Sequence, residues 1–390
     1  MKKIIALLLA LVMVMGMVAC GAETSAPAES AAPAESAAAP AESAAAPAES
    51  AEAPAEAGYA GESFTIWMAS DATETADQAA PMVKFRDLVQ EKSGGKITVD
   101  VAWGGTQYDN AGIFSAMKDG LLSMDIMLMN KHGGNLPLMS WGFMPYSATA
   151  QESIDQTNYL LFENETTSKI IADYFAASNM KILGNSCDGA PSFVTTFAWD
   201  GLDDLVTKCS AFGTMNTAKY QAIGLNCTAV PAPECYDNLS RGIVDGVSAP
   251  LSTAITNSMY EVAPFATVDG QYTSAVLIVA NTDFWAGLSE EAQALISECV
   301  AETSAFSAEH ITASTKAAAD TWKEKTGNDV VFMNEEDGKA LWAQTLGAIA
   351  TNSSANAAGQ AYEADMNTIL TEWVKYQEEY HGIDIAWEGK

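Results

Sequence analysis

The sequence predicts an α/β fold with two lobes, and three features of the chain indicate it. Apolar runs of strand length alternate with helical patterns from about residue 62 to the end of the chain. That stretch is long enough for a large core and for two domains. One helical pattern also continues unbroken from about Leu288 to Lys325. Because sheets of this class bind ligands beyond the carboxyl ends of their strands, we expect a ligand site there.

The first 19 residues form a predicted export signal. Two lysines precede an apolar run, Ile4–Val18, that is shorter than the roughly 20 residues of a membrane-spanning helix. The letters "MVAC", 17–20, resemble a bacterial lipobox, which implies cleavage before Cys20 and a lipid on that cysteine. The alternative is an ordinary signal peptide whose cysteine is incidental.

Residues 20–61 form a predicted disordered tether. Ala, Pro, Glu and Ser repeat throughout it, and the recurring prolines prevent a continuous helix. Such a segment buries too little apolar surface to offset the entropy of ordering. A coil of about 40 residues would hold the following domain on the order of 35 Å from its anchor.

The charge balance excludes one class of partner. The chain carries 19 Lys and Arg residues against 50 Asp and Glu residues, whereas nucleic-acid binding needs a basic surface. Hydrophobic residues make up 48% of the chain, which indicates a globular protein. After the signal, no apolar stretch is long enough to span a membrane.

Signals for a metal or a disulfide are weak. The sequence has neither a CxxC motif nor a histidine cluster, so we expect no metal site and no cofactor. Five cysteines follow Cys20, and an odd number cannot all pair within one chain. Cys227 and Cys235 flank "TAVPAPE" and are candidates for a pair, whereas buried free thiols are the usual alternative.

Apolar and period-two runs predict the strands. The first two strands flank a helix that ends at Gly94 and Gly95, and this β-α-β unit favours a parallel sheet. Ser289 is a good N-cap for the longest helix, and the tail from 335 to about 380 is predicted to be mostly helical. The predicted strands are 64–69, 97–101, 124–130, 180–186, 208–213, 244–250 and 274–281.

No motif of a known catalytic class is present. The sequence has no GxSxG, P-loop, GxGxxG or HExxH pattern. "GNSCDG", 184–189, combines a serine with a cysteine, but a turn at the end of a strand explains it. Carboxylates are numerous, so a glycosidase-type pair stays open although nothing selects one. We therefore expect a protein that is not an enzyme.

Five segments occur in a characteristic order along the chain. They are "FRDLVQEKSGGKITVDV", "LGNSCDGAPSF", "WDGLDDL", "GIVDGVSAP" and "YEVAPFATVDGQYTSAVLIVANTDFWAGLSEEAQALI". Each is loose alone, but their order and spacing resemble those of the extracytoplasmic solute-binding subunits of TRAP transporters, often called DctP-type. The resemblance covers nearly the whole folded part.

The resemblance implies a two-lobed periplasmic-binding-protein-like fold of the α/β class with a long inter-lobe helix. Lobe I would contain residues 62–182 and 273–312, and lobe II residues 183–272 and 313–390. It also implies that the lobes close around a small solute and that the closed protein docks on the membrane permease subunits. The expected location is extracytoplasmic, with a lipid anchor in the cell membrane.

One departure from the family concerns anion binding. The family places a buried arginine in the strand after "DL", where its planar fork holds a carboxylate. Here neither Ser210 nor Ala211 can make that clamp, and "VSA" at 247–249 replaces the usual "QEN". The two arginines, Arg86 and Arg241, are expected on solvated helix faces. Because a buried carboxylate without a cation is expensive, we expect a neutral or zwitterionic solute rather than a simple dicarboxylate.

Loops after the strands supply the candidate ligand-binding residues. Their aromatic and polar side chains would form a neutral or slightly acidic pocket, where Asp71 or Asp188 could hold a cation together with ring faces. The alternative is core packing for each aromatic and a solvated surface for each acid. The candidates are Asp71, Trp103, Gln107, Asn130, Trp141, Phe143, Tyr146, Asp188, Ser210, Phe212 and Ser248.

The sequence thus predicts a receptor that captures a small organic solute and delivers it to a TRAP permease. The alternatives are an ABC-type receptor and a sensor-associated solute-binding lipoprotein. The unbroken helix from about Leu288 to Lys325 favours the first prediction over an ABC-type receptor.

Overall fold

The computed structural model describes the folded part of the chain. Every described residue belongs to one compact unit, Ala55–Lys390. Among these residues, no helix combines the length and the hydrophobicity that crossing a bilayer requires. The described residues are 59–132, 134–139, 149–187, 189, 191–198, 209–212, 221, 224–229, 234–268, 276–333, 335–385 and 387.

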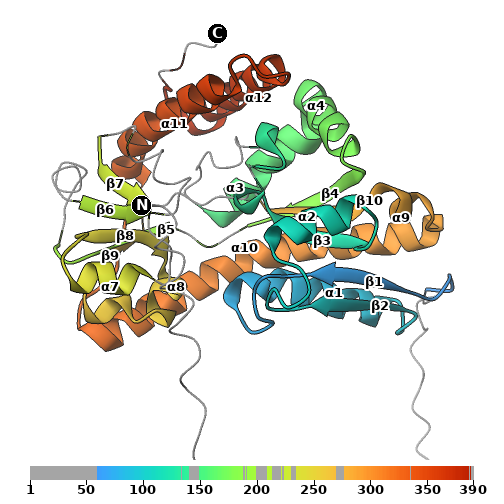
Figure 1. Ribbon diagram of the computed structural model, residues 1–390, viewed down its shortest axis with the longest axis horizontal. Helices are drawn as coiled ribbons and strands as arrows, with labels where there is room; N and C mark the ends of the chain where they lie inside the picture. The colour runs from blue at the N-terminus through green and yellow to red at the C-terminus, as the bar shows by residue number, and fades with distance from the viewer. Residues whose placement is uncertain are drawn as a thin grey trace, which may run out of the picture. The chain divides into compact units, whose positions relative to one another are not determined.

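The strands form three sheets of two, three and six strands (Figure 1). The strands are β1 (Phe64–Ala69), β2 (Ile97–Ala102), β3 (Met124–Leu128), β4 (Met180–Ser186), β5 (Pro191–Thr195), β6 (Cys209–Phe212), β7 (Asn226–Ala229), β8 (Gly246–Pro250), β9 (Phe265–Val268), β10 (Val276–Asn281) and β11 (Val331–Phe332).

Strand direction differs between the sheets. β1 and β2 pair in parallel, as the β-α-β pattern predicts. β10 lies between β3 and β4 and runs antiparallel to both. The six-stranded sheet has the order β11-β9-β5-β8-β6-β7, in which β5 runs antiparallel to β8 and β9 while β6 runs parallel to β7 and β8.

Helices surround these sheets (Figure 1). They are η1 (Asp77–Ala79), α1 (Ala80–Lys92), α2 (Asn110–Lys118), η2 (Met129–Lys131), α3 (Ala150–Asn158), the π-helix η4 (Tyr159–Glu163), α4 (Glu165–Ala176), α7 (Cys235–Ser240), α8 (Leu251–Thr256), η6 (Met259–Glu261), α9 (Thr282–Ala286), α10 (Glu290–Thr326), α11 (Glu335–Ala357), α12 (Glu363–Tyr376) and the π-helix η7 (Gln377–His381).

The long helix α10 has 37 residues and runs past two groups of strands. The first group is the two-stranded and three-stranded sheets, and the second is the six-stranded sheet. Ser289 caps its first turn, because the Ser289 hydroxyl accepts a hydrogen bond from the Ala292 N–H at 3.2 Å. Gly327 ends it in the left-handed conformation, with φ of 78°. α10 contacts α1, α3 and β4, and it also contacts α8 and η6 beside the six-stranded sheet.

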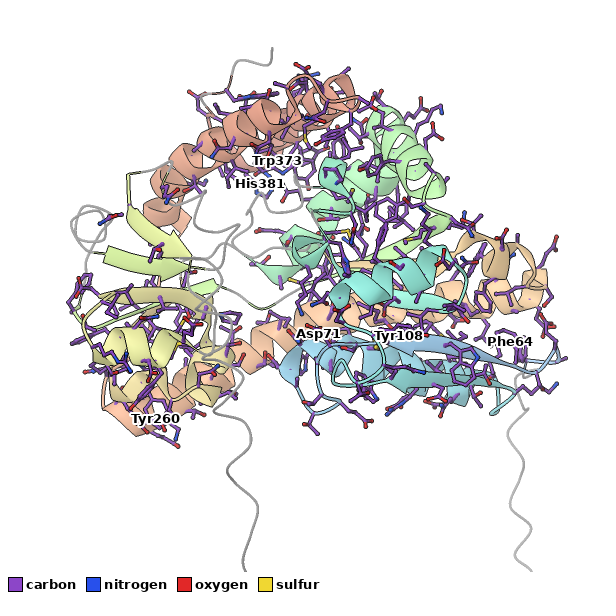
Figure 2. All side chains as sticks on the ribbon, in the orientation of Figure 1. Phe64, Asp71, Tyr108, Tyr260, Trp373 and His381 are labelled. Carbon is purple, nitrogen blue, oxygen red and sulfur yellow. The ribbon has the colours of Figure 1, made fainter. Side chains whose placement is uncertain are left out.

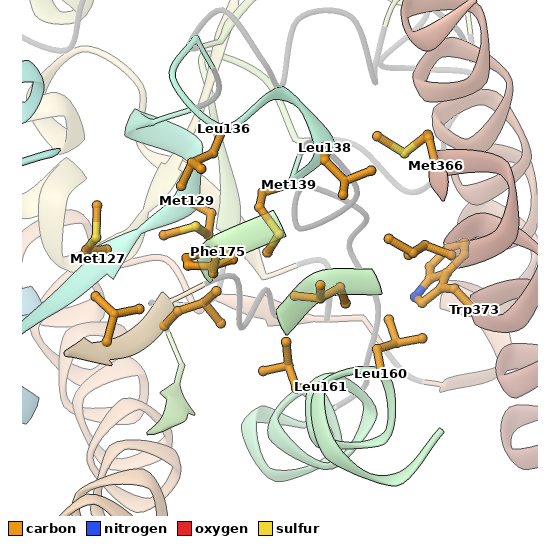
Figure 3. Packing of buried hydrophobic residues seen from close by; sticks show 14 of the residues in the cluster. Met127, Met129, Leu136, Leu138, Met139, Leu160, Leu161, Phe175, Met366 and Trp373 are labelled. Carbon is orange, nitrogen blue, oxygen red and sulfur yellow. The ribbon is translucent and has the colours of Figure 1, made fainter. Parts of the chain in front are cut away.

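Separate hydrophobic clusters support the two groups of strands. The largest joins β3, α4 and the C-terminal helix α12, where Trp373 and Leu160 are buried (Figure 3). A second lies between β1, α1 and α10 around Phe85 and Ile296. A third lies beneath the six-stranded sheet around Trp322, whose indole N–H donates to the Pro264 carbonyl at 3.1 Å.

Most predicted strands are confirmed, with differences at their ends. The predicted strand 124–130 ends at Leu128 because η2 begins at Met129. β5, β7, β9 and β11 have no counterpart among the predicted strands. The lobe boundaries stay a prediction, and α11 and α12, which the sequence assigns to lobe II, contribute to the same cluster as α4 and β3.

Candidate functional site

A small cavity lies at the carboxyl ends of β1 and β3. Its volume is about 30 Å³, which is room for one water-sized group. The loops after both strands and the starts of α1 and α2 close around it. It is lined by Ala69, Ser70, Asp71, Gln78, Ala79, Met82, Asn110, Ile113, Asp125, Ile126, Met127, Leu128, Lys131 and His132.

Asp71 and Lys131 form an ion pair beside this cavity. Lys131 Nζ lies 2.6 Å from Oδ2 and 2.9 Å from Oδ1 of Asp71, and Asn110 Nδ2 donates to Oδ2 at 3.2 Å. Burial alone raises the pKa of Asp71, but the hydrogen bonds from Lys131 and Asn110 and the lysine charge bring it below its usual value. The loop after β1, where Figure 2 labels Asp71, therefore carries an ionised carboxylate at neutral pH.

Lys131 keeps one unused donor. An ammonium group has three N–H donors. Two of them are directed at Asp71, and no other hydrogen bond of Lys131 occurs within the described part of the chain. The Lys131 side chain is 27% exposed, so its third N–H is open to an acceptor from outside. The ion pair is thus a neutral unit that offers one hydrogen bond.

Asp125 is a carboxyl group inside an apolar strand. It is 2% exposed, and its side chain points into the cavity lining from the second position of β3. Burial raises its pKa to about 8, against hydrogen bonds from the backbone of Ile126 and Ala69 that lower it and the charge of Asp71 that raises it. The Asp125 carboxyl is therefore largely protonated at pH 7.

His132 follows η2 and is neutral. It is 2% exposed, and burial together with the charge of Lys131 lowers its pKa to about 4. Within the described residues, neither Asp125 Oδ1 nor His132 Nδ1 has a hydrogen-bond partner. Two buried polar atoms without partners on one cavity are rare in native proteins and call for an occupant.

The structure places the predicted site residues in different surroundings. Among those whose side chains it describes, Asp71 alone lines the cavity. Trp103 is half-buried against the cluster of β1 and α1, and Gln107 is exposed in the loop after β2. Ser248 lies in β8, 8% exposed, and its hydroxyl has no partner among the described residues.

For three further predicted residues the structure describes the backbone alone, and four others lie outside the described part of the chain. Asn130 lies in η2. Ser210 and Phe212 lie in β6, where Ser210 is in register with Gly246 of β8. The residues outside the described part of the chain are Trp141, Phe143, Tyr146 and Asp188.

Both arginines are engaged in ion pairs away from the cavity. Arg86 Nη1 lies 2.6 Å from Glu74, and its Nε lies 3.0 Å from Asp87. Arg241 Nη2 lies 3.7 Å from Asp237 one turn earlier, and its side chain is 69% exposed. Neither guanidinium lines the cavity.

Sequence reasoning missed Lys131, Asn110 and Asp125. Lys131 directly follows a predicted site residue, Asn130, but a lysine at such a position is usually solvated. The available signal was Asp125, since an acid inside the apolar run "MDIML" is unusual for a buried strand.

A larger hollow is less suited to recognition of a polar solute. It has a volume of about 560 Å³ and lies between η4, α4 and β4. Its walls are mainly apolar, including Leu161, Phe162 and Ile171. Of its three charged residues, Lys169 and Asp173 pair with each other at the surface and the third is Lys181. Convergent polar groups with shifted pKa values occur instead at the smaller cavity.

The described residues contain no group of three or more His, Cys, Asp or Glu side chains arranged to hold a metal ion. Cys299 of α10 is a buried free thiol. Burial raises the pKa of Cys299 to about 12, so it is not a thiolate at neutral pH.

The family model for bacterial extracellular solute-binding proteins, family 7 (DctP), matches residues 68–353. The ectoine/5-hydroxyectoine-binding periplasmic protein UehA of Ruegeria pomeroyi is 24% identical over 249 residues, which is 62% of this chain and 70% of that protein. The ectoine-binding periplasmic protein TeaA of Halomonas elongata is 37% identical over 94 residues, which is 24% of this chain and 27% of that protein.

Solved structures show the same fold. A TRAP periplasmic solute-binding protein from Ochrobactrum anthropi superposes with a TM-score of 0.67 at 21% identity, covering 83% of this chain and 99% of that one. TeaA without ligand superposes with a TM-score of 0.68 at 21% identity, covering 80% of this chain and all of that one. The chain therefore belongs to family 7 of the bacterial extracellular solute-binding proteins, the DctP family of TRAP transporter receptors, and has their two-lobed fold.

Proposed function

We propose that this receptor binds a small neutral or zwitterionic organic solute at the carboxyl ends of β1 and β3, where Lys131 holds one acceptor atom of the solute. The observation that carries the proposal is the neutral Asp71–Lys131 pair with one unused N–H. A hydroxyl, a carbonyl or the single carboxylate of a zwitterion is a suitable acceptor for it.

A simple dicarboxylate fits this site less well. Each carboxylate that leaves water needs a cation or several donors in exchange. Asp71 already neutralises Lys131, and both arginines are paired elsewhere. A second carboxylate would therefore find no cation among the described side chains of the cavity.

The names of the relatives are compatible with more than one solute class. UehA and TeaA are named for ectoine, whereas DctB of Bacillus subtilis, 21% identical over 272 residues, is named for C4-dicarboxylates. At these identities the names support a small organic solute for this chain, and the site chemistry carries the choice between classes.

Closure of the two lobes is the proposed mechanism of capture. α10 contacts β4 of the three-stranded sheet and also α8 and η6 beside the six-stranded sheet, so its bending would accompany a change in the separation of the two sheets. The solute stabilises the closed form only through contacts that the open form lacks. The closed receptor would then deliver its solute to the permease, and the ABC-type and sensor alternatives are not favoured by the family match.

Native mass spectrometry of freshly purified protein, followed by calorimetry with any co-purified molecule, tests the solute class. Lys131→Met should weaken binding of that molecule by about tenfold or more, because it removes a charged donor. Lys316→Met is the matched control, since Lys316 forms an exposed ion pair with Asp320 on α10. Tight binding of succinate or malate, unchanged in Lys131→Met, would overturn the proposal.

We further propose that the mature chain begins at a lipid-modified Cys20 and is held at the outer face of the cell membrane. The apolar run before "MVAC" and the tether after it support this. Intact mass analysis of the protein from its membrane fraction should show an N-terminal peptide that begins at Cys20 and carries acyl chains. An unmodified Cys20, or a different mature N-terminus, would contradict it.

A further inference from the structure

We propose that Asp125 and His132 form a buried subsite for one hydroxyl-sized group. In the solute-free protein the occupant is a water molecule, and in the complex it is a hydroxyl group of the solute. The second half rests on the proposed function, whereas the first half does not.

The primary observation is a pair of orphaned polar atoms. Asp125 Oδ1 and His132 Nδ1 are buried and lack partners among the described residues, and both residues line the same cavity. Each polar atom left without a partner in the interior destabilises the protein, so native structures fill such sites with water or ligand. Because Asp125 and His132 line the same small cavity, we place one occupant in contact with both.

The size of the cavity favours a small occupant. Its volume of about 30 Å³ has room for a water molecule or a hydroxyl group. The cavity also adjoins Lys131, whose third N–H is unused. A solute that places an acceptor on Lys131 is therefore in position to lower a hydroxyl substituent into the cavity.

The protonation states select the chemistry of the occupant. The protonated Asp125 carboxyl donates a hydrogen bond from its free oxygen, because burial raises its pKa. The neutral His132 ring accepts one at Nδ1 when its proton is on Nε2. A group that accepts one hydrogen bond and donates another is a water or a hydroxyl. A metal cation is disfavoured, since Asp125 is uncharged and the Lys131 ammonium is close.

A high-resolution crystal structure of the solute-free protein tests the first half. We expect one ordered water within about 2.6–3.2 Å of both Asp125 Oδ1 and His132 Nδ1. A dry cavity, or a direct hydrogen bond between the two side chains, would overturn it. This test does not depend on solute binding, so its result is independent of whether the proposed function is correct.

Two probes that differ by one hydroxyl test the second half, namely 5-hydroxyectoine and ectoine. The wild-type protein should bind the hydroxylated probe roughly tenfold to a hundredfold more tightly. Asp125→Leu should abolish that preference, whereas Asp125→Asn, which keeps a donor and an acceptor of the same shape, should retain it within about threefold. Equal affinity for both probes in the wild type would overturn the hydroxyl subsite while leaving the proposed solute site intact.

The same measurement separates a binding role from a structural one. Asp125→Leu removes the carboxyl group that accepts hydrogen bonds from the backbone of Ile126 and Ala69, so its thermal midpoint should fall. Asp125→Asn keeps that acceptor, and His132→Leu removes an Nδ1 atom without a partner among the described residues, so both should stay near the wild-type midpoint. Loss of the probe preference in His132→Leu with an unchanged midpoint supports the subsite. If Asp125→Leu does not fold, the same calorimetric assay is carried out with His132→Leu, which removes the Nδ1 acceptor and keeps the Asp125 carboxyl.

Discussion

Asp125 and His132 respond to pH in opposite senses. The pKa of Asp125 rises to about 8 on folding. Its contribution to the free energy of unfolding is therefore fully present at a pH below the pKa of Asp125 in the unfolded chain, and it is lost as the pH rises through 8. The pKa of His132 falls to about 4 on folding, so its contribution is present above its unfolded value near 6.5 and is lost as the pH falls through 4. Between pH 4 and 6.5 the two groups therefore change the free energy of unfolding with pH in opposite directions.

Above pH 6.5 only the Asp125 slope remains. We expect Asp125 to lower the free energy of unfolding by up to about 1.4 kcal/mol per pH unit between pH 6.5 and 8. Asp125→Asn cannot ionise, so the variant should gain stability relative to the wild type across this window. Urea denaturation at pH 6.5, 7.2 and 8 measures the difference. Parallel curves for the two proteins would show that Asp125 ionises normally.

At the residue scale, the sequence indicated the position of the site but few of its members. Asp71 follows the first predicted strand, and strand ends are where such sheets bind ligands. The sequence could not predict the role of Lys131, because its partner Asp71 is 60 positions away in the chain. The two residues meet only because the ends of β1 and β3 lie close together in the fold. No local pattern encodes such a pair.

At the element scale, the contact between β4 and α10 depends on the absence of a side chain. A Cβ atom built on Gly184 would lie 2.5 Å from Val300 Cγ1. Gly184→Ala should therefore lower the free energy of unfolding by about 1–3 kcal/mol, because the strand and the helix must separate. Urea denaturation checks this value, with Gly134→Ala as control, since nothing lies within 4 Å of a Cβ there.

A second substitution identifies the cause. Gly184→Ala combined with Val300→Ala should recover part of the loss, because the smaller side chain removes the clash. If the double variant is less stable than the sum of the two single changes, the clash is not the reason.

The start of α10 is fixed by a single hydroxyl. Ser289 Oγ accepts from the Ala292 N–H and donates to Glu62 Oε2 at 2.8 Å. Ser289→Ala should cost about 1 kcal/mol of unfolding free energy, as for other N-caps. Ser297→Ala is the control inside the same helix, where the hydroxyl bonds back to the Gln293 carbonyl and its loss should be neutral. Thermal unfolding compares the two.

Elements with strong local signals were predicted, and elements defined by distant partners were not. Ser289 and the following periodicity located α10, and the apolar run of β10 located that strand. β5, "PSFVT", has a proline and a serine at its start and gains its identity from pairing with β8 and β9. The antiparallel insertion of β10 between β3 and β4 is likewise non-local, so periodicity could not reveal it.

At the scale of the whole molecule, solute binding should both compact and stabilise the receptor. Small-angle scattering with saturating co-purified solute should give a smaller radius of gyration, because closure brings the two groups of strands together. Solute at about 100 times its Kd should raise the free energy of unfolding by about 2.7 kcal/mol. Saturated binding in calorimetry with an unchanged radius of gyration would argue against closure.

The place of β10 has a consequence for biosynthesis. It is the central strand of its sheet, yet the chain reaches it only after β5, β6, β7, β8 and β9 of the other sheet. During translation, β3 and β4 therefore leave the ribosome with their mutual partner still unmade, and both edges stay open until residue 281 has emerged. Any single cleavage of the polypeptide between β3 and β10 separates strands of the three-stranded sheet. We therefore expect the nascent N-terminal half to be the form of this protein that most needs a chaperone.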